Sequence, residues 1–185
     1  MDLETIRARL KARHPGRAPG LSLPSAAVSL ILAPSGGELE LLLIKRSEHP
    51  KDPWSGHMAL PGGRREARDR SLAATARRET LEETGIAIDR PSLLGELEDL
   101  LPLSPGAPRL VIRPFVFGLR KRPPVVPSPE VAGHLWTTLT ALKASFARTT
   151  VLLGGRKLEV DAYLLGPHVV WGITQRILAR FLGLL

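Results

Sequence analysis

Residues 62–86 read GGRREARDRSLAATARRETLEETGI: a glycine pair, an arginine-rich loop and a segment whose apolar residues have helical spacing. Asp69 and Ser71 are both residue types that favour a helix N-cap. Gly85 is the residue type that most often follows a helix in the left-handed conformation. The stretch therefore predicts a helix over residues 71–84, with the glycines and arginines just before it.

Three carboxylates lie near the end of this predicted helix. Glu79, Glu82 and Glu83 stand at positions i, i+3 and i+4 and share one face. That face begins as an apolar stripe, so we expect the carboxylates to point inward or into a cleft. Like charges at this spacing repel, and the C-terminal end of a helix disfavours anions. The cluster therefore indicates a hard divalent cation, Mg²⁺ with Mn²⁺ as an alternative; a solvated helix pairing with Arg77 and Arg78 would also explain it.

Strand and helix patterns alternate along the rest of the chain. We expect strands at residues 25–33, 39–46, 86–88, 92–97, 110–119, 130–136, 149–153 and 157–160, and helices at residues 2–13, 137–146 and 168–184. Strands on both sides of a central helix predict an α/β or α+β fold, with a mixed sheet sandwiched between helices. The length of 185 residues suits one domain. We place it at residues 25–185, after an N-terminal helix and linker at residues 1–24.

Composition narrows the classes of function. The chain has no cysteine, which excludes disulfide frameworks, thiolate metal sites and cysteine nucleophiles. Aromatic residues make up only 4%, which argues against a stacking platform for single-stranded nucleic acid. The net charge of +8 is compatible with an anionic partner.

No apolar run is long enough for a membrane span and no export signal is visible, so we expect a cytoplasmic protein. We expect the C-terminal helix to pack in the core or in a homodimer, not to lie on a membrane.

The opening stretch resembles the Nudix box of the Nudix hydrolases, which combines a glycine, an acidic residue, the run R-E-x-x-E-E-x-G and an aliphatic residue. The matching residues here are Gly63, Asp69, Arg78, Glu79, Glu82, Glu83, Gly85 and Ile86. The acidic residue is aspartate where glutamate is usual, and eight residues instead of seven separate it from Arg78. Thr80 occupies a position that is usually aliphatic.

These departures are common in the coenzyme A pyrophosphatase branch, which the chain also resembles outside the box. That branch carries a run like LLTxRS, a histidine–glycine pair and then FPGG. The corresponding segments here are LLIKRS at 42–47, Gly56 and LPGG at 60–63. Trp54 stands about where the histidine is expected, in a loop one residue longer. Further similar segments are Pro114, Pro129-Glu130-Val131 and VWGIT at 170–174.

The resemblance implies a Nudix fold and a hydrolase that uses water to cleave a diphosphate linked to another moiety. The implied metal ligands are Glu79, Glu82, Glu83 and the Gly63 carbonyl. One of these glutamates, or Glu130 from a neighbouring loop, would be the general base. Arg78 would orient Glu79 or Glu82 through a charge-assisted hydrogen bond. The candidates for binding substrate are Arg46, Arg64, Arg65 and His57.

The implied partner is a small-molecule diphosphate. The leading substrate is coenzyme A or a derivative, cleaved to 3′,5′-ADP and 4′-phosphopantetheine. ADP-ribose, nucleoside diphosphate sugars and damaged nucleotides are the alternative substrates. A second class of function is a Nudix-fold protein that binds its ligand without catalysis. The intact set of three glutamates argues against this class. Messenger RNA decapping is a third, supported by the net charge alone, and we expect no nucleic-acid partner.

Overall fold

The computed structural model describes residues 1–18, 24–50, 54–103 and 109–185. A seven-stranded sheet runs in the order β3-β2-β1-β6-β5, with β4 also paired to β1 and β7 to β2. Its strands are β1 (Ser25–Ser35), β2 (Glu38–Arg46), β3 (Met58–Ala59), β4 (Gly62–Arg64), β5 (Leu93–Glu96), β6 (Val111–Gly118) and β7 (Val131–Thr138). The β1–β6 pair is parallel and the other pairs are antiparallel, so the sheet is mixed as expected.

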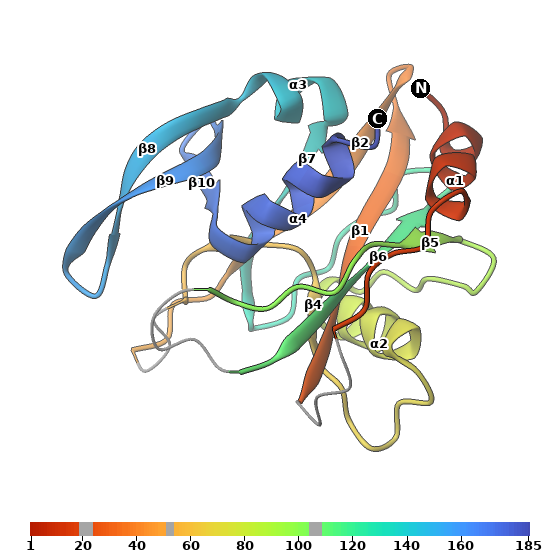
Figure 1. Cartoon of the computed structure of the whole chain (residues 1–185), viewed down its shortest axis with the longest axis horizontal. Helices are drawn as coiled ribbons and strands as arrows, with labels where there is room; N and C mark the ends of the chain where they lie inside the picture. Colours follow the sequence, from red (N-terminus) through yellow and green to blue (C-terminus); the bar gives the residue numbers. More distant parts are fainter. Residues whose placement is uncertain (19–23, 51–53, 104–108) are drawn as a thin grey trace.

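A smaller sheet and four helices complete the described fold. The second sheet holds β8 (Phe146–Leu153), β9 (Arg156–Leu165) and β10 (His168–Trp171), and its β8–β9 hairpin extends away from the body in Figure 1. The helices are α1 (Leu3–Lys11), α2 (Leu72–Thr84), α3 (Leu139–Ala144) and α4 (Gly172–Leu182). None of the helices in the described ranges has the length and apolarity needed to cross a membrane.

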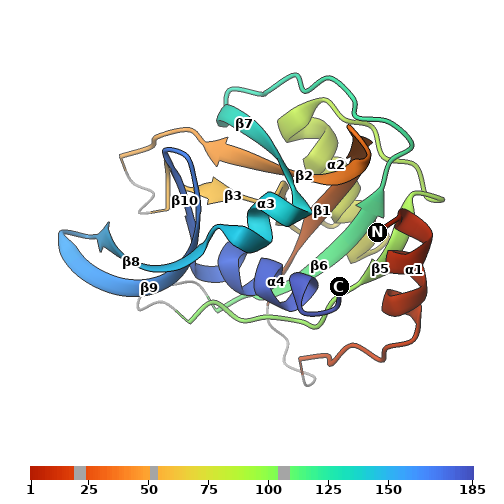
Figure 2. The same ribbon diagram turned by 90° about the horizontal axis from the view of Figure 1, so that it is seen from above.

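Helices cover both faces of the main sheet. Figure 2 shows the sheet between α2 on one side and α4 on the other, with α1 beside β5. Alternate residues of β1 enter two separate hydrophobic clusters: Ile31 packs on the α2 side, and Leu30 packs with residues of α1 and α4. Burial on both faces explains why β1 reads as a nearly continuous apolar run. The expected sandwich of a mixed sheet between helices is therefore confirmed.

Two of the expected elements are wrong. Residues 86–88 form no strand, because Ile86 and Ile88 pack into the cluster beside α2 without pairing with a neighbouring strand. The expected helix at 168–184 begins only at Gly172, since residues 168–171 pair with β9 as strand β10. In both places the apolar pattern correctly predicts that side chains are buried, but it does not predict which segment the backbone pairs with.

Strand β1 brings the glycine pair to the helix. β4 pairs with β1 in the register Ala27 to Gly63 and Val28 to Gly62. The approach is so close that a Cβ atom on Gly62 would lie 2.3 Å from the Ala27 carbonyl oxygen, and Gly62 has a φ of 154°. Because α2 packs over both β1 and β4, the glycines lie directly beside the helix that carries the glutamates.

A buried set of hydroxyl groups joins α2 to β1. The Thr80 and Ser29 hydroxyls are 2.8 Å apart, and the Ala76 carbonyl lies 2.8 Å from Thr80 and 3.2 Å from Ser29. Both side chains are fully buried. A threonine at this usually aliphatic position is accommodated because Ser29 supplies its polar partner.

Candidate active site

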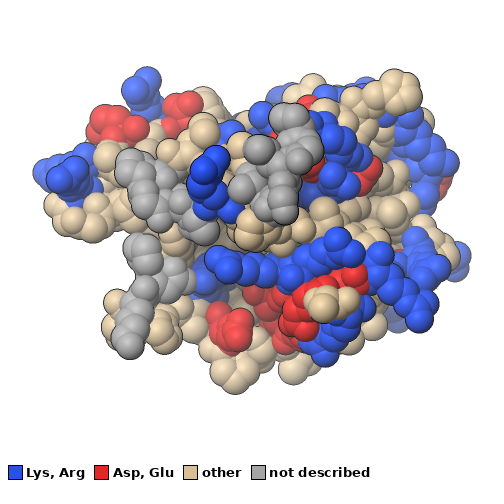
Figure 3. All heavy atoms as spheres, turned by 60° about the horizontal axis from the view of Figure 1, so that its bottom comes forward, with Lys and Arg blue, Asp and Glu red and all other residues tan. Residues whose placement is uncertain are grey.

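The glutamate-bearing half of α2 meets β4, the end of β2 and the loop before β7. Glu83 is the most buried of the three glutamates, with 8% of the residue exposed. One of its carboxylate oxygens accepts a hydrogen bond of 2.9 Å from the Gly62 amide. Glu79 is partly buried beside Gly63, whereas the Glu82 side chain is 48% exposed. Glu83 and Glu79 are thus the inner carboxylates, and Glu82 lies at the exposed edge of the cluster. Figure 3 shows the acidic side chains of this face bordered by Lys and Arg side chains.

The guanidinium of Arg78 connects these carboxylates to the loop before the helix. It donates to both oxygens of Asp69 at 3.1 and 2.9 Å. It also donates to Glu79 at 2.9 Å, to Glu82 at 2.8 Å and to the Arg64 carbonyl at 3.0 Å. Such forked, charge-assisted bonds fix direction as well as distance. Arg78 thus contacts both glutamates that the sequence named as its targets.

Asp69 is the residue that fixes Arg78, a position that sequence reasoning left between two roles. Ser71 is the N-cap of α2, because its hydroxyl accepts a hydrogen bond from the Ala74 amide at 3.1 Å. Asp69 is 6% exposed and also accepts bonds from the Glu66 amide at 2.9 Å and the Thr75 hydroxyl at 3.0 Å. Hydrogen bonds from Arg78 hold the pKa of Asp69 well below its usual range. Asp69 is therefore charged throughout the neutral range.

The two inner glutamates have the opposite shift. Burial raises the pKa of Glu83 to about 7, although the Gly62 amide and Arg46 both lower it; Glu79 and Glu130 raise it further. Burial also raises the pKa of Glu79, against the effect of Arg78. Glu83 can therefore exchange a proton near neutral pH.

The other predicted site residues fall into two groups. Arg46 and Glu130 both influence the pKa of Glu83, and the Ser47 amide donates to the Glu130 carbonyl at 2.8 Å. His57 lies next to Arg46, since its carbonyl accepts the Arg46 amide at 3.0 Å. On the other side, Arg64 contacts Arg78 only through its backbone carbonyl, and the Arg65 guanidinium lies 3.2 Å from the Asp69 carbonyl.

The rings of Trp54, His57 and Trp171 form a cluster that the sequence analysis did not predict. The His57 ring lies 5.1 Å from the Trp171 ring and 6.0 Å from the Trp54 ring, measured between centroids. Trp54 and Trp171 are also 6.0 Å apart. Trp171 was assigned to a helix from its sequence, so the strand that carries it to this loop was missed. The spacing of residues along the chain contains no signal for that contact.

The donor atoms suit a hard cation. Carboxylate oxygens are the ligands that Mg²⁺ and Mn²⁺ prefer. Across the described ranges no three acidic or histidine side chains converge closely enough to form a complete metal site, and Arg78 holds both Glu79 and Glu82. A Cβ atom on Gly63 would lie 2.5 Å from the Glu79 carboxylate carbon, so the bare backbone leaves room there for that group. Burial, together with the nearby charges of Glu79 and Glu130, raises the pKa of Glu83, and a cation at this position would favour its charged form.

The glycine pair supplies a matched test of this geometry. We expect Gly62→Ala to lower the free energy of unfolding by at least about 2 kcal/mol, because its Cβ would meet backbone. Gly63→Ala should fold nearly normally, because its Cβ meets the flexible end of Glu79; it should lose cation affinity instead. Urea denaturation and Mn²⁺ titration check both. Equal loss of stability in the two variants would contradict the assignment.

The Asp69–Arg78 pair predicts how stability depends on pH. Because the folded-state pKa of Asp69 is lowered, its stabilisation is present above the ordinary carboxyl pKa and is lost as pH falls through the lowered value. Asp69→Asn should cost about 2 kcal/mol at pH 7. The difference from the parent protein should stay constant from about pH 5 to 8 and shrink below about pH 4.

Urea denaturation across this pH range, without metal, measures the difference. Glu4→Gln, which removes an exposed carboxylate that pairs with Arg7, is the control and should cost less than about 1 kcal/mol. A difference at pH 7 that persists unchanged at pH 3 would show that the Asp69 charge is not responsible.

Comparison with known proteins identifies the family. The NUDIX domain model matches residues 23–152, well over half of the chain. An uncharacterized protein of Schizosaccharomyces pombe is 39% identical over 128 residues, which are 66% of this chain and 39% of that protein. The human mitochondrial coenzyme A diphosphatase NUDT8 is 29% identical over 189 residues, covering 96% of this chain and 72% of that protein. The chain thus spans about two fifths of the yeast relative and most of the human one.

A solved structure gives the same result for the fold. A MutT/nudix family protein from Enterococcus faecalis superposes with a TM-score of 0.60 over 96% of this chain and 66% of that chain. Its sequence identity of 19% makes this a likeness of fold alone. The family model spans α2 with its glutamates, the glycine pair and the Arg78–Asp69 contact. The chain therefore belongs to the NUDIX domain family.

Proposed function

We propose that this chain hydrolyses the diphosphate linkage of coenzyme A or a derivative, giving 3′,5′-ADP and 4′-phosphopantetheine, with Mg²⁺ or Mn²⁺ as cofactor. The observation that carries the proposal is the arrangement of α2: Arg78 orients Glu79 and Glu82, and Glu83 lies buried next to them with a pKa near neutrality. A protein that only binds a diphosphate has no need of a proton acceptor in this position.

Glu83 is the residue we assign as general base. A base works best when its pKa lies near the working pH, and burial brings that of Glu83 to about 7. Water would form a bond to one phosphorus as the bond from that phosphorus to the bridging oxygen breaks. The bridging oxygen leaves with the other phosphate, and Glu83 takes the proton of the water. Glu130, exposed in the loop before β7, is the alternative acceptor.

The remaining site residues bind and orient. Glu79, Glu82, Glu83 and the Gly63 carbonyl are the groups that would hold the cation. When bound, the cation neutralises diphosphate charge and activates water. Arg78 positions two of these carboxylates, and Asp69 positions Arg78. Arg46 lies close enough to Glu83 to lower its pKa, so its guanidinium is the first candidate for a contact with the diphosphate. Arg64, Arg65 and His57 are further candidates for substrate contacts.

Coenzyme A is proposed as the substrate on two grounds. The segments 42–47 and 60–63 resemble the coenzyme A pyrophosphatase branch, and they flank the loop that leads into β4. The human relative that aligns with 96% of this chain is named a coenzyme A diphosphatase. ADP-ribose and nucleoside diphosphate sugars share the same diphosphate and remain the competing substrates.

Replacing the proposed base tests the mechanism. We expect Glu83→Gln to lower turnover at least about a hundredfold, because the amide can neither take the proton nor bind the cation as a carboxylate does. Its melting temperature should not fall, since removing one of several clustered like charges relieves repulsion. The parent enzyme should lose activity as pH falls, because protonation of Glu83 removes both the base and a cation ligand; a bound cation favours the charged carboxylate, so the loss should come below the pKa of about 7 that burial gives Glu83 without metal.

Steady-state assays with saturating Mg²⁺ over a range of pH measure both effects. Glu159→Gln, on the distant β8–β9 hairpin, is the matched control and should keep full activity. Near-normal turnover of the Glu83 variant would move the essential role to Glu82 or Glu130.

A substrate panel tests the rest of the proposal. Purified protein with Mg²⁺ should release 3′,5′-ADP from coenzyme A, as identified by mass, and should stop when a chelator strips the metal. Coenzyme A should be cleaved with a higher kcat/KM than ADP-ribose or a nucleotide sugar. Rapid cleavage of ADP-ribose with no product from coenzyme A would contradict the proposed substrate but support the proposed hydrolase activity. Product formation that continues undiminished in excess chelator would overturn the metal-dependent mechanism.

A further inference from the structure

A basic pocket lies at the start of α2, beside the glutamate cluster but not built from it. It encloses about 600 Å³, and four of its lining residues are the arginines Arg68, Arg70, Arg77 and Arg90. Two come from the loop before the helix, one from the helix itself and one from the segment before β5. Residues far apart in the sequence therefore converge on one concave surface.

Positive charge in this pocket is not compensated by the protein. Among the residues that the structure describes, Arg70, Arg77 and Arg90 make no ion pair and donate no side-chain hydrogen bond. Asp69 is the acidic residue of the lining, and Arg78 engages both of its oxygens. Elsewhere arginines such as Arg113 have carboxylate partners. Three unpaired guanidinium groups around one cavity form an attractive field for an anion.

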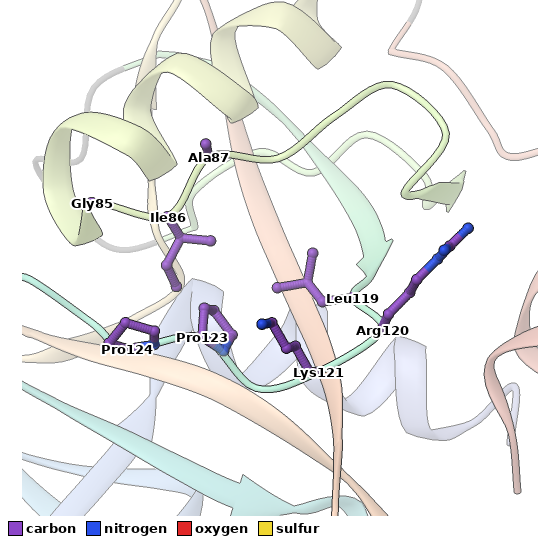
Figure 4. A pocket seen from close by; sticks show the side chains of 8 residues that line it. All are labelled: Gly85, Ile86, Ala87, Leu119, Arg120, Lys121, Pro123 and Pro124. Atoms are coloured by element: carbon purple, nitrogen blue, oxygen red, sulfur yellow. The ribbon is translucent and has the colours of Figure 1, made fainter.

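The lining between the arginines is open, and the charge of Asp69, its acidic residue, is already engaged by Arg78. Ala73 and Ala74 present only methyl groups, and the first turn of α2 contains no acidic residue. A guanidinium fork matches the oxygens of a phosphate, which can be shared among several arginines. A second pocket, at the far end of α2, encloses about 310 Å³; in Figure 4 its Arg120 extends away from Ile86 and Pro124. It lacks this convergence of arginines.

Arg68 connects the pocket to the proposed hydrolytic site. It lines the pocket, while its guanidinium contacts Glu66 at 2.7 Å and Glu82 at 3.3 Å. An anion in the pocket would therefore compete with Glu82 for Arg68. Occupation of the pocket and the freedom of a proposed metal ligand are coupled through this one side chain.

We propose that the arginine pocket binds a phosphate group and influences the reaction at the adjacent glutamates, the influence on the reaction resting on the proposed function. The phosphate has two sources: a third phosphate carried by the substrate itself, as on the ribose of coenzyme A, or a separate phosphate compound. Both present the same oxygens to the arginines, so the chemistry of the site is the same in each case.

Binding is tested first, without turnover. Calorimetric titration with 3′,5′-ADP and with inorganic phosphate is done in excess chelator. We expect saturable binding, weakened about tenfold or more in Arg77→Ala and in Arg90→Ala. Arg156→Ala, in the distant β8–β9 hairpin, removes the same charge and should bind as the parent does. Arg90→Lys, which keeps the charge but not the fork, should fall between. Absent binding, or equal weakening in Arg156→Ala, overturns the proposal.

Kinetics then identify the source of the phosphate. If the substrate carries it, Arg90→Ala raises the KM for coenzyme A about tenfold and leaves that for dephospho-coenzyme A unchanged. If a separate compound carries it, inorganic phosphate changes the rates of both substrates in the parent and of neither in the variant. Phosphate binding that affects neither reaction overturns the link to catalysis. If the protein cleaves no diphosphate but still binds phosphate, the result refutes the proposed function and still supports phosphate binding by the pocket.

Discussion

The contact between Arg78 and Asp69 determines where the functional groups of this protein lie. A guanidinium has five donors in one plane, and here the loop, the helix and β4 all accept from it. Because Asp69 is buried and charged, the Arg78 plane cannot turn without leaving that charge unpaired, which is costly. Arg78 thus orients the carboxylates of Glu79 and Glu82 without needing to touch the substrate itself.

Glu83 is held by a different principle. Its partner is a backbone amide of β4, and β4 is attached to the central strand β1. The site therefore rests on two independent supports, one electrostatic and one made by strand pairing. The first orients two carboxylates, and the second keeps one carboxylate in an environment where its proton is labile.

The sequence was sufficient for the parts of the site that depend on local spacing. Helix α2, the glycine at its end and the contact of Arg78 with Glu79 and Glu82 follow from separations of one to four residues. The pattern did not show how far each glutamate is buried, because an apolar stripe has a width, and Glu82 lies at its exposed edge. Trp171 could not be placed beside His57, since 114 positions separate them and they meet only through tertiary structure, where β10 packs against β3. The roles of the individual glutamates remain proposals.

The attachment of β4 to β1 also links the site to the folding of the whole chain. β1 is paired with β4 and β2 along one edge and with β6 along the other, and the partner of Ala26 in β6 is Ile112. The β1–β2 hairpin is local, but the pairings of β1 with β4 and with β6 join distant segments, which come together late in folding. A chain in which β4 has not yet joined β1 has no amide in place to hold Glu83. A cation that needs Glu83 held there would bind the native state alone, so by mass action it would protect the protein from thermal denaturation and proteolysis, and the added stability would grow with the logarithm of its concentration.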